Sequence, residues 1–112
     1  MSKYGNKKTF VDNIPFDSKH EASRFIELRY MQRAGLIKNL ILQKRFELIP
    51  KIKKSDGKIQ RPTYYIADFC YSEKTKDGWR TVVEDAKGCR TEVYKMKKKL
   101  MLWRHGIEIR EV

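Results

Sequence analysis

RPTYYIADFCYSEKTKDGWRTVVEDAK, residues 61–87, contains two strand-like stretches that are joined by a turn. Residues 61–72 and 79–87 are rich in aromatic and β-branched residues, which favour strands. Asp77-Gly78 between them is a dipeptide typical of tight hairpin turns. The segment therefore predicts a β-hairpin, in which residues whose numbers sum to about 154 lie opposite each other.

Each predicted strand of this hairpin carries an aspartate at the end far from the turn. Asp68 and Asp85 satisfy the pairing relation to within about one residue, so we expect them to be near neighbours across the ladder. Because strand side chains alternate, Asp85 shares a face with Lys87, whereas Glu84 faces the other way. Two facing carboxylates repel each other. Either a divalent cation between them or a salt-bridge cluster with Lys87 and nearby arginines would account for the pair.

One helix is predicted before this region and one after it. The first begins at Ser18, whose spacing from Glu21 is that of a capping box, runs to about residue 34 and ends at Gly35. Ala22, Phe25, Ile26 and Arg29 are predicted to form one stripe of this helix, with Leu28 on its flank. The second runs from residue 91 to residue 104 and stops at Gly106. Its predicted apolar face consists of Val93, Met96, Leu100 and Trp103.

Further strands complete the predicted sheet. Residues 44–52 form a strand that precedes the hairpin, and an Asp56-Gly57 turn follows it. Residues 107–111 form a short last strand, which a helical crossover makes parallel to the hairpin's second strand. Residues 9–16 form a small separate hairpin. The predicted fold class is α/β, a single domain over residues 1–112. Its mixed sheet, a three-stranded antiparallel meander plus a C-terminal strand, is flanked by two helices in the order α-β-β-β-α-β.

The composition indicates a basic cytoplasmic protein. The 112 residues include 26 Lys plus Arg against 14 Asp plus Glu, a formal net charge of +12. Such an excess is typical of nucleic-acid-binding proteins, although a merely solvated basic surface gives the same count. No apolar run approaches the roughly 20 residues that span a bilayer, and the N-terminus lacks a signal-peptide core. We therefore expect Cys70 and Cys89 to be reduced, and neither they nor His20 and His105 have the spacing of a zinc site.

The array of Glu21, Asp68 and Asp85-x-Lys87 followed by a basic helix resembles the PD-(D/E)XK nuclease superfamily. Four segments, spread between residues 3 and 101, are similar to a small phage-borne family of endonucleases, to small Holliday-junction resolvases and to the nuclease subunit of cut-and-paste transposition systems. These segments are KYGNKKTFVDNIPFDSKHEASR, LQKRFEL, YIADFCY and VVEDAKGCRTEVYKMKKKLM. In one departure, Ala67 stands where the superfamily usually has a proline. The resemblance implies a restriction-endonuclease-like fold.

The resemblance also implies a catalytic set of Glu21, Asp68, Asp85 and Lys87. In that reading Asp68 and Asp85 hold Mg²⁺, or Mn²⁺, and the backbone carbonyl of Ala86 supplies a further ligand. Glu21 reaches the metal from its helix, although the capping box alone also explains a glutamate there. Lys87 orients or deprotonates the attacking water and stabilises charge on the phosphate.

Two polar residues near this set have open roles, and several basic residues are expected to contact DNA. Glu84 either bonds to a basic residue behind the sheet or serves as a substitute ligand, and Gln43 is expected to lie apart from the site. Thr91, with the amides at its helix N-terminus, forms an anion site, and Lys97 is expected to point towards the sheet. The complete expected DNA-binding set is Lys7 and Lys8 in a basic, flexible N-terminal segment (residues 1–8), Lys44, Arg45, Thr91, Lys95, Lys97, Lys98 and Lys99.

The expected function is metal-dependent hydrolysis of DNA phosphodiester bonds by an endonuclease. So short a chain has little length for a domain that reads sequence, which favours structure-selective cutting of branched DNA such as a Holliday junction. A homodimer is expected, because opposed strands need two nicks and each chain has one site. The alternatives are a non-catalytic basic DNA-binding accessory protein, or an exonuclease or recombination nuclease of the same fold.

Overall fold

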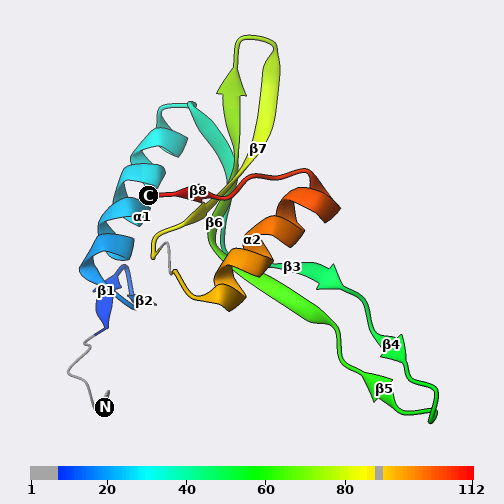
Figure 1. The fold of residues 1–112 in the computed structure, drawn as a ribbon. Coiled ribbons are helices and arrows are strands. Elements are labelled where there is room, and N and C mark those ends of the chain that lie inside the picture. The colour runs from blue at the N-terminus through cyan, green and yellow to red at the C-terminus, as the bar shows by residue number, and fades with distance from the viewer. Residues whose placement is uncertain (1–7, 88–89) are drawn as a thin grey trace.

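The computed structural model describes residues 8–87 and 90–112, in which two helices and eight strands form a mixed α/β domain (Figure 1). The helices are α1 (Lys19–Arg33) and α2 (Glu92–His105). The main sheet contains β3 (Ile37–Ile49), β6 (Thr63–Thr75), β7 (Gly78–Asp85) and β8 (Arg110–Glu111). Two small ribbons contain β1 (Thr9–Val11) with β2 (Ile14–Phe16), and β4 (Ile52–Lys53) with β5 (Ile59–Gln60). No helix in the described ranges is long and apolar enough to cross a membrane.

The main sheet has the strand order β3-β6-β7-β8. β3, β6 and β7 are antiparallel neighbours and β8 runs parallel to β7, so the predicted mixed sheet is confirmed. Along the β6–β7 ladder Cys70 pairs with Val83 and Phe69 pairs with Glu84. The same register continued by one residue places Asp68 beside Asp85, as the turn position predicts.

Several predicted boundaries were wrong. The first strand of the sheet is not 44–52: β3 begins at Ile37 and ends at Ile49, because Pro50 has no N–H to continue the ladder. Residues 52–53 belong instead to a separate ribbon. Of the predicted last strand, 107–111, only Arg110–Glu111 pairs with the sheet. The small hairpin at residues 9–16 is confirmed, with left-handed backbone at Asp12 and Asn13.

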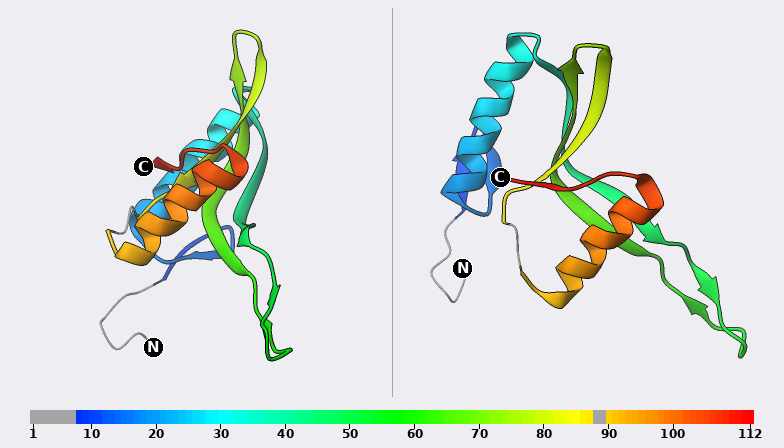
Figure 2. Two further views of the ribbon diagram at one scale, coloured as in Figure 1. Left: turned by 45° about the vertical axis from the view of Figure 1, so that its right-hand side comes forward. Right: turned by 45° about the horizontal axis from the view of Figure 1, so that its top comes forward.

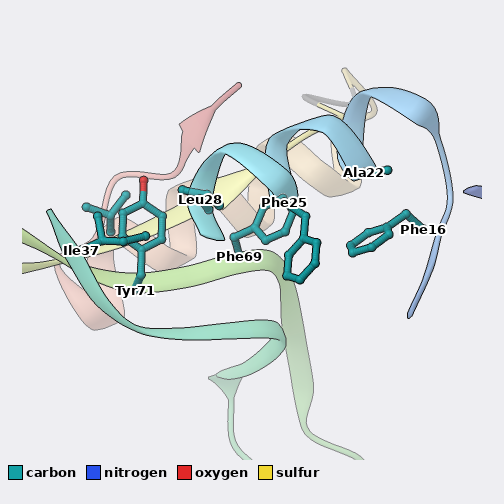
Figure 3. Packing of buried hydrophobic residues seen from close by; sticks show 8 residues of the cluster. Phe16, Ala22, Phe25, Leu28, Ile37, Phe69 and Tyr71 are labelled. Carbon is teal, nitrogen blue, oxygen red and sulfur yellow. The ribbon is translucent and has the colours of Figure 1, made fainter. Parts of the chain in front are cut away.

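Each helix covers its own hydrophobic cluster. α1 packs on the cluster of Phe25, Leu28, Phe69 and Tyr71, which Figure 3 shows between the helix and the sheet. α2 packs on a second cluster, which includes Leu48, Ala67, Cys70, Val83 and Met101. Figure 2 shows that the two helices lie on different parts of the sheet. Strand β6 contributes to both clusters and therefore connects the two halves of the domain.

The ends of both helices agree with those predicted from the sequence, but the buried faces agree with the prediction only in part. Ser18 and Thr91 are the N-caps, and Gly106 ends α2 in the left-handed conformation. The predicted apolar face of α2 was wrong for three of its four residues: Val93, Met96 and Trp103 are 65%, 64% and 78% exposed. The fourth, Leu100, packs against the second cluster, and Met101, which was not predicted, is fully buried. Tyr94 and Met101 both pack on the second cluster, and the hydroxyl of Tyr94 also donates a hydrogen bond of 2.7 Å to Glu111 on β8. On α1, Ile26 of the predicted stripe is exposed as well.

Candidate active site

Asp68 lies on β6 between residues of the two hydrophobic clusters. Ala67 belongs to the cluster under α2, and Phe69 belongs to the cluster under α1. On the neighbouring strand, Leu42 pairs with Phe69 and Lys44 pairs with Ala67, which leaves Gln43 opposite Asp68. Gln43 has a φ of 52°, a left-handed conformation that is uncommon outside glycine and recurs at functional sites.

Gln43 connects two buried carboxylates from different elements. Its side-chain Nε2 donates long hydrogen bonds, each of 3.4 Å, to Glu21 Oε1 in the first turn of α1 and to Asp68 Oδ1 on β6. The expectation that Gln43 lies apart from the site was therefore wrong. The only signal for this position in the sequence was a weak one, a glutamine at the end of an apolar stretch.

Glu21 has two roles at the start of α1. Its backbone N–H donates to the Ser18 hydroxyl at 3.1 Å, which satisfies one half of the predicted capping box. Its side chain is 3% exposed, and Oε2 is buried with no hydrogen-bond partner among the described residues. Burial raises the pKa of Glu21, and the charge of Asp68 raises it further. Capping therefore explains the backbone of Glu21 but gives its Oε2 atom no hydrogen-bond partner within the described part of the chain.

The end of the β6–β7 hairpin positions Asp68 and Asp85. Asp68 Oδ2 accepts a hydrogen bond of 2.8 Å from the backbone N–H of Ala86. Asp85 accepts from the backbone N–H of Lys87 at 2.9 Å and from the hydroxyl of Tyr65 at 2.7 Å. Burial raises the pKa of Asp68, the N–H of Ala86 partly offsets this effect, and the charge of Asp85 adds to it. The two aspartates, 9% and 8% exposed, therefore form a fixed, largely desolvated pair.

Lys87 stands beside these carboxylates but is bound by another residue. Its ammonium donates to Asp17 Oδ2 at 3.0 Å, and Lys8 bonds to the other Asp17 oxygen at 3.1 Å. The bond to Asp17 raises the pKa of Lys87, and the charges of Asp68 and Glu21 raise it further, so Lys87 keeps its proton at neutral pH. Sequence reasoning missed Asp17 as a partner, and its only signal was its position directly before the Ser18 cap.

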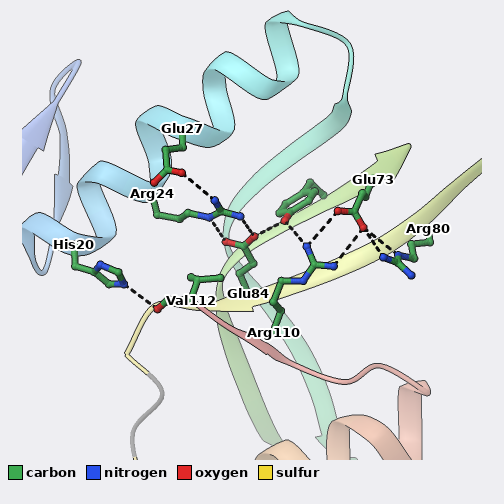
Figure 4. A network of polar contacts seen from close by, with 9 residues as sticks. His20, Arg24, Glu27, Glu73, Arg80, Glu84, Arg110 and Val112 are labelled. Atoms are coloured by element: carbon green, nitrogen blue, oxygen red, sulfur yellow. Dashed lines mark hydrogen bonds and ion pairs between the residues drawn. The ribbon is translucent and has the colours of Figure 1, made fainter. Parts of the chain in front are cut away.

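Glu84 faces away from this set and forms an ion pair under α1. Its two carboxylate oxygens accept from Arg24 Nε at 2.9 Å and from Arg24 Nη2 at 2.6 Å (Figure 4). The hydroxyl of Tyr71 also donates to Glu84. Burial, together with this bond, raises the pKa of Tyr71 to about 12. Of the two predicted alternatives, the bond to a basic residue behind the sheet is the one observed.

The carboxylate oxygens of the candidate site fit some of the requirements of a magnesium site. Across residues 8–87 and 90–112, no three Asp, Glu, His or Cys side chains are grouped closely enough to form a metal-binding cluster. Mg²⁺, however, commonly uses one or two carboxylates, several waters and substrate phosphates rather than an all-protein cage. Among the described residues, Glu21 Oε2 has no hydrogen-bond partner and Asp68 Oδ1 has only the long contact with the Gln43 amide. Both are hard oxygen donors of this kind. The residues present therefore fit an ion that is completed by water and phosphate.

The structure brings only some of the predicted DNA-binding residues near this set. Lys8 joins it through Asp17, and Lys7 lies outside the described residues. Thr91 accepts from the N–H of Tyr94 at 3.1 Å and so acts as a helix cap. Lys95 forms an ion pair with Glu92, and Lys98 forms one with Glu111. Lys44 lies over the ring of Phe46, and Arg45 lies over the ring of Tyr64. Lys97 is half-buried beside Thr91 and Tyr65, and Lys99 is exposed.

No curated protein and no solved structure matches the chain. One family model, described as "Protein of unknown function (DUF1064)", matches residues 1–110. That span includes Glu21, Asp68, Asp85 and Lys87. The chain therefore belongs to the DUF1064 family.

Proposed function

We propose that this protein is a metal-dependent DNA endonuclease with a restriction-endonuclease-like fold, whose active site consists of Glu21, Gln43, Asp68, Asp85 and Lys87. The observation that carries the proposal is the buried Oε2 atom of Glu21, which has no partner among the described residues and belongs to a carboxylate linked to Asp68 through Gln43. A buried acceptor without a donor costs free energy, and a bound cation removes that cost.

The neighbouring residues supply the rest of the proposed chemistry. When bound, Mg²⁺ supplies charge neutralisation for the phosphate and lowers the pKa of a coordinated water. Asp85 is held in place by Tyr65 and the N–H of Lys87, so it presents a preorganised carboxylate beside Asp68. Lys87 is an ammonium bound to Asp17, which favours a role in orienting water and stabilising phosphate charge over a role as general base.

The substrate class proposed is branched DNA, cut by a homodimer. Two nicks in opposed strands require two sites, and each chain has one. On α2, Val93, Met96 and Trp103 form an exposed apolar strip on one side of the helix, which we assign to contact with a second copy of the chain. The large exposed fraction of these side chains supports this assignment, because soluble proteins rarely leave several large apolar groups together in water.

A substrate panel tests this proposal. Labelled four-way junction, matched linear duplex and single strands are incubated with the protein in Mg²⁺, in Mn²⁺ and in EDTA. Symmetric, metal-dependent nicks in the junction support a resolvase-type endonuclease, and nicking of closed plasmid distinguishes it from an exonuclease that trims ends. An Asp85→Ala variant, shown to fold by circular dichroism, must lose the cleavage.

A second candidate function is a DNA-binding module without catalysis. The absence of a three-residue metal-binding cluster in the described ranges favours it. In that case the folded protein binds DNA but cleaves no substrate of the panel in either metal, and neither Mg²⁺ nor Mn²⁺ changes its melting temperature.

A further inference from the structure

Residues 50–62, here called the arm, project from the end of the main sheet as a narrow two-stranded ribbon (Figures 1 and 2). Every residue from 50 to 61 is exposed. The β3–β6 ladder ends at the pair Ile49–Thr63, directly before Pro50 on one strand and after Pro62 on the other. Because proline donates no hydrogen bond, the two prolines separate the arm from the sheet on both strands.

The arm carries an unneutralised positive charge. It contains one carboxylate, Asp56, which accepts from the backbone N–H of Lys58 at 2.9 Å and so closes the turn. It also contains five cations, and none of them has an ion-pair partner among the residues that the structure describes. These cations are Lys51, Lys53, Lys54, Lys58 and Arg61. By contrast, Lys8, Arg24 and Lys87 around the candidate site are all paired with carboxylates.

Packing against the rest of the chain does not account for this segment. Ile52 and Ile59, its two large apolar residues, are 45% and 54% exposed. Cations that repel each other on a projecting ribbon are a cost to the free protein, and a polyanion removes that cost. The major groove of B-DNA, about 12 Å wide, accepts a two-stranded β-ribbon.

We propose that the arm docks in the major groove of duplex DNA, with its lysines on the phosphates and Ile52 and Ile59 against the groove. The inference rests on the proposed function, which it deepens by naming the form of DNA that the protein holds. Along β6, Asp68 lies at most roughly 35–40 Å from the turn at Gly57, at ~3.3 Å per residue. This distance matches about one turn of B-DNA, ~34 Å, so one duplex segment can contact both the arm and the candidate site.

Two double variants with the same change in charge test the inference. Lys53→Gln/Lys58→Gln alters the arm, and Lys74→Gln/Lys76→Gln alters the tip of the β6–β7 hairpin, where both lysines are also exposed and without ion-pair partners in the described residues. Binding of each protein to a fluorescent duplex of about three turns (~30 base pairs) is measured by anisotropy in EDTA over a range of salt concentrations. EDTA prevents cleavage, so the result does not depend on catalysis.

The arm variant is expected to bind roughly tenfold to fiftyfold more weakly, and the slope of log K against log salt is expected to fall by about 2, at ~0.9 per lost phosphate contact. The hairpin control is expected to bind within about twofold of the wild type, well below the effect of one lost contact. The inference is overturned if the two variants have the same affinity for DNA, whether both keep the wild-type affinity or both lose it to the same extent. It is also overturned if the arm variant changes the oligomeric state, measured by light scattering, and leaves the salt slope unaltered, because the arm then contacts protein.

Different results would overturn the arm inference and the endonuclease proposal. Arm-dependent binding by a wild-type protein that cleaves nothing in Mg²⁺ or Mn²⁺ leaves the arm inference intact and removes the endonuclease. If the wild type cleaves DNA and the arm variant binds and cuts like the control, the endonuclease proposal is supported and the arm inference is overturned.

Discussion

Gln43 lies opposite Asp68 across the β3–β6 ladder, with a left-handed backbone and a side-chain amide 3.4 Å from Asp68 Oδ1. The same amide is 3.4 Å from Glu21 Oε1, so one strained residue links a helix carboxylate to a strand carboxylate. Left-handed backbone at a residue with a β-carbon costs about 1 kcal/mol. We therefore expect the amide of Gln43 to contribute to the site and its backbone to lower stability.

Substitutions at Gln43 separate the backbone from the amide. Gln43→Gly is expected to be more stable than Gln43→Ala by roughly 1 kcal/mol, because glycine adopts positive φ without penalty. Both variants are expected to lose about tenfold or more in cleavage, because both lack the amide that orients Glu21 and Asp68. Urea unfolding and junction cleavage, measured on the same preparations, check the two effects. Full activity in Gln43→Gly would contradict the role of the amide.

Removal of the charge from Asp68 is expected to stabilise the protein as it abolishes activity. Asp68→Asn keeps an oxygen that can accept from the N–H of Ala86 and removes a buried charge next to Asp85. A gain of about 1 kcal/mol in the free energy of unfolding, in EDTA, is the expected result.

Glu84→Ala is the matched contrast within the same hairpin. It leaves Arg24 without its buried partner and is expected to cost roughly 3–5 kcal/mol. Urea unfolding of both variants measures the difference. Destabilisation of similar size in the two variants would mean that Asp68 is a structural ion-pair residue like Glu84.

The raised pKa values of Glu21 and Asp68 predict how stability depends on pH. An acid whose pKa is higher in the folded state stabilises the fold fully below its unfolded pKa, here near the ordinary values of 4.5 and 3.8. That contribution is lost as the pH rises through the folded pKa. The stability of the wild type relative to Glu21→Gln is therefore expected to fall as the pH rises above about 4.5 in EDTA.

Magnesium is expected to reverse this pH trend, because a bound cation favours the ionised carboxylates. Urea unfolding at a series of pH values, with and without Mg²⁺, measures both effects. The control is Glu27→Gln, which changes an exposed glutamate on the same helix. A pH profile for Glu21→Gln that coincides with the wild type in EDTA would show that Glu21 is not the titrating group.

The exposed strip on α2 predicts a dimer that a single charge disrupts. Trp103→Glu is expected to convert a homodimer into a monomer in light scattering, because it places a charge within an apolar contact. Trp79→Glu, on β7 and 43% exposed, is expected to leave the dimer unchanged. A wild-type protein that is monomeric at micromolar concentration would contradict the dimer proposal.

Local signals in the sequence predicted the helix ends and the hairpin register. Ser18, Thr91 and Gly106 act through bonds within their own helix, and Asp77-Gly78 sets a register that brings Asp68 beside Asp85. These features depend on few neighbours, so the local sequence is sufficient to predict them.

Other features depend on tertiary contacts that no local pattern contains. The bond between Lys87 and Asp17 spans 70 residues. The amide of Gln43 bonds to Glu21, which lies 22 residues away on α1. The buried side of α2 is the one whose residues, Tyr94 and Met101, pack on the sheet's second cluster. Pro50 was a usable signal for the end of β3, because proline interrupts a strand ladder.

The most direct test of the central claim compares two aspartates of one hairpin. Cleavage of a labelled four-way junction in Mg²⁺ and in EDTA is measured for the wild type, Asp68→Asn and Asp77→Asn. Asp77→Asn retains an equally good Asn-Gly turn and serves as the control. The account predicts Mg²⁺-dependent nicking by the wild type and by Asp77→Asn, with a loss of at least about 10³-fold in Asp68→Asn. Absence of cleavage by folded wild-type protein, or full activity in Asp68→Asn, would contradict it.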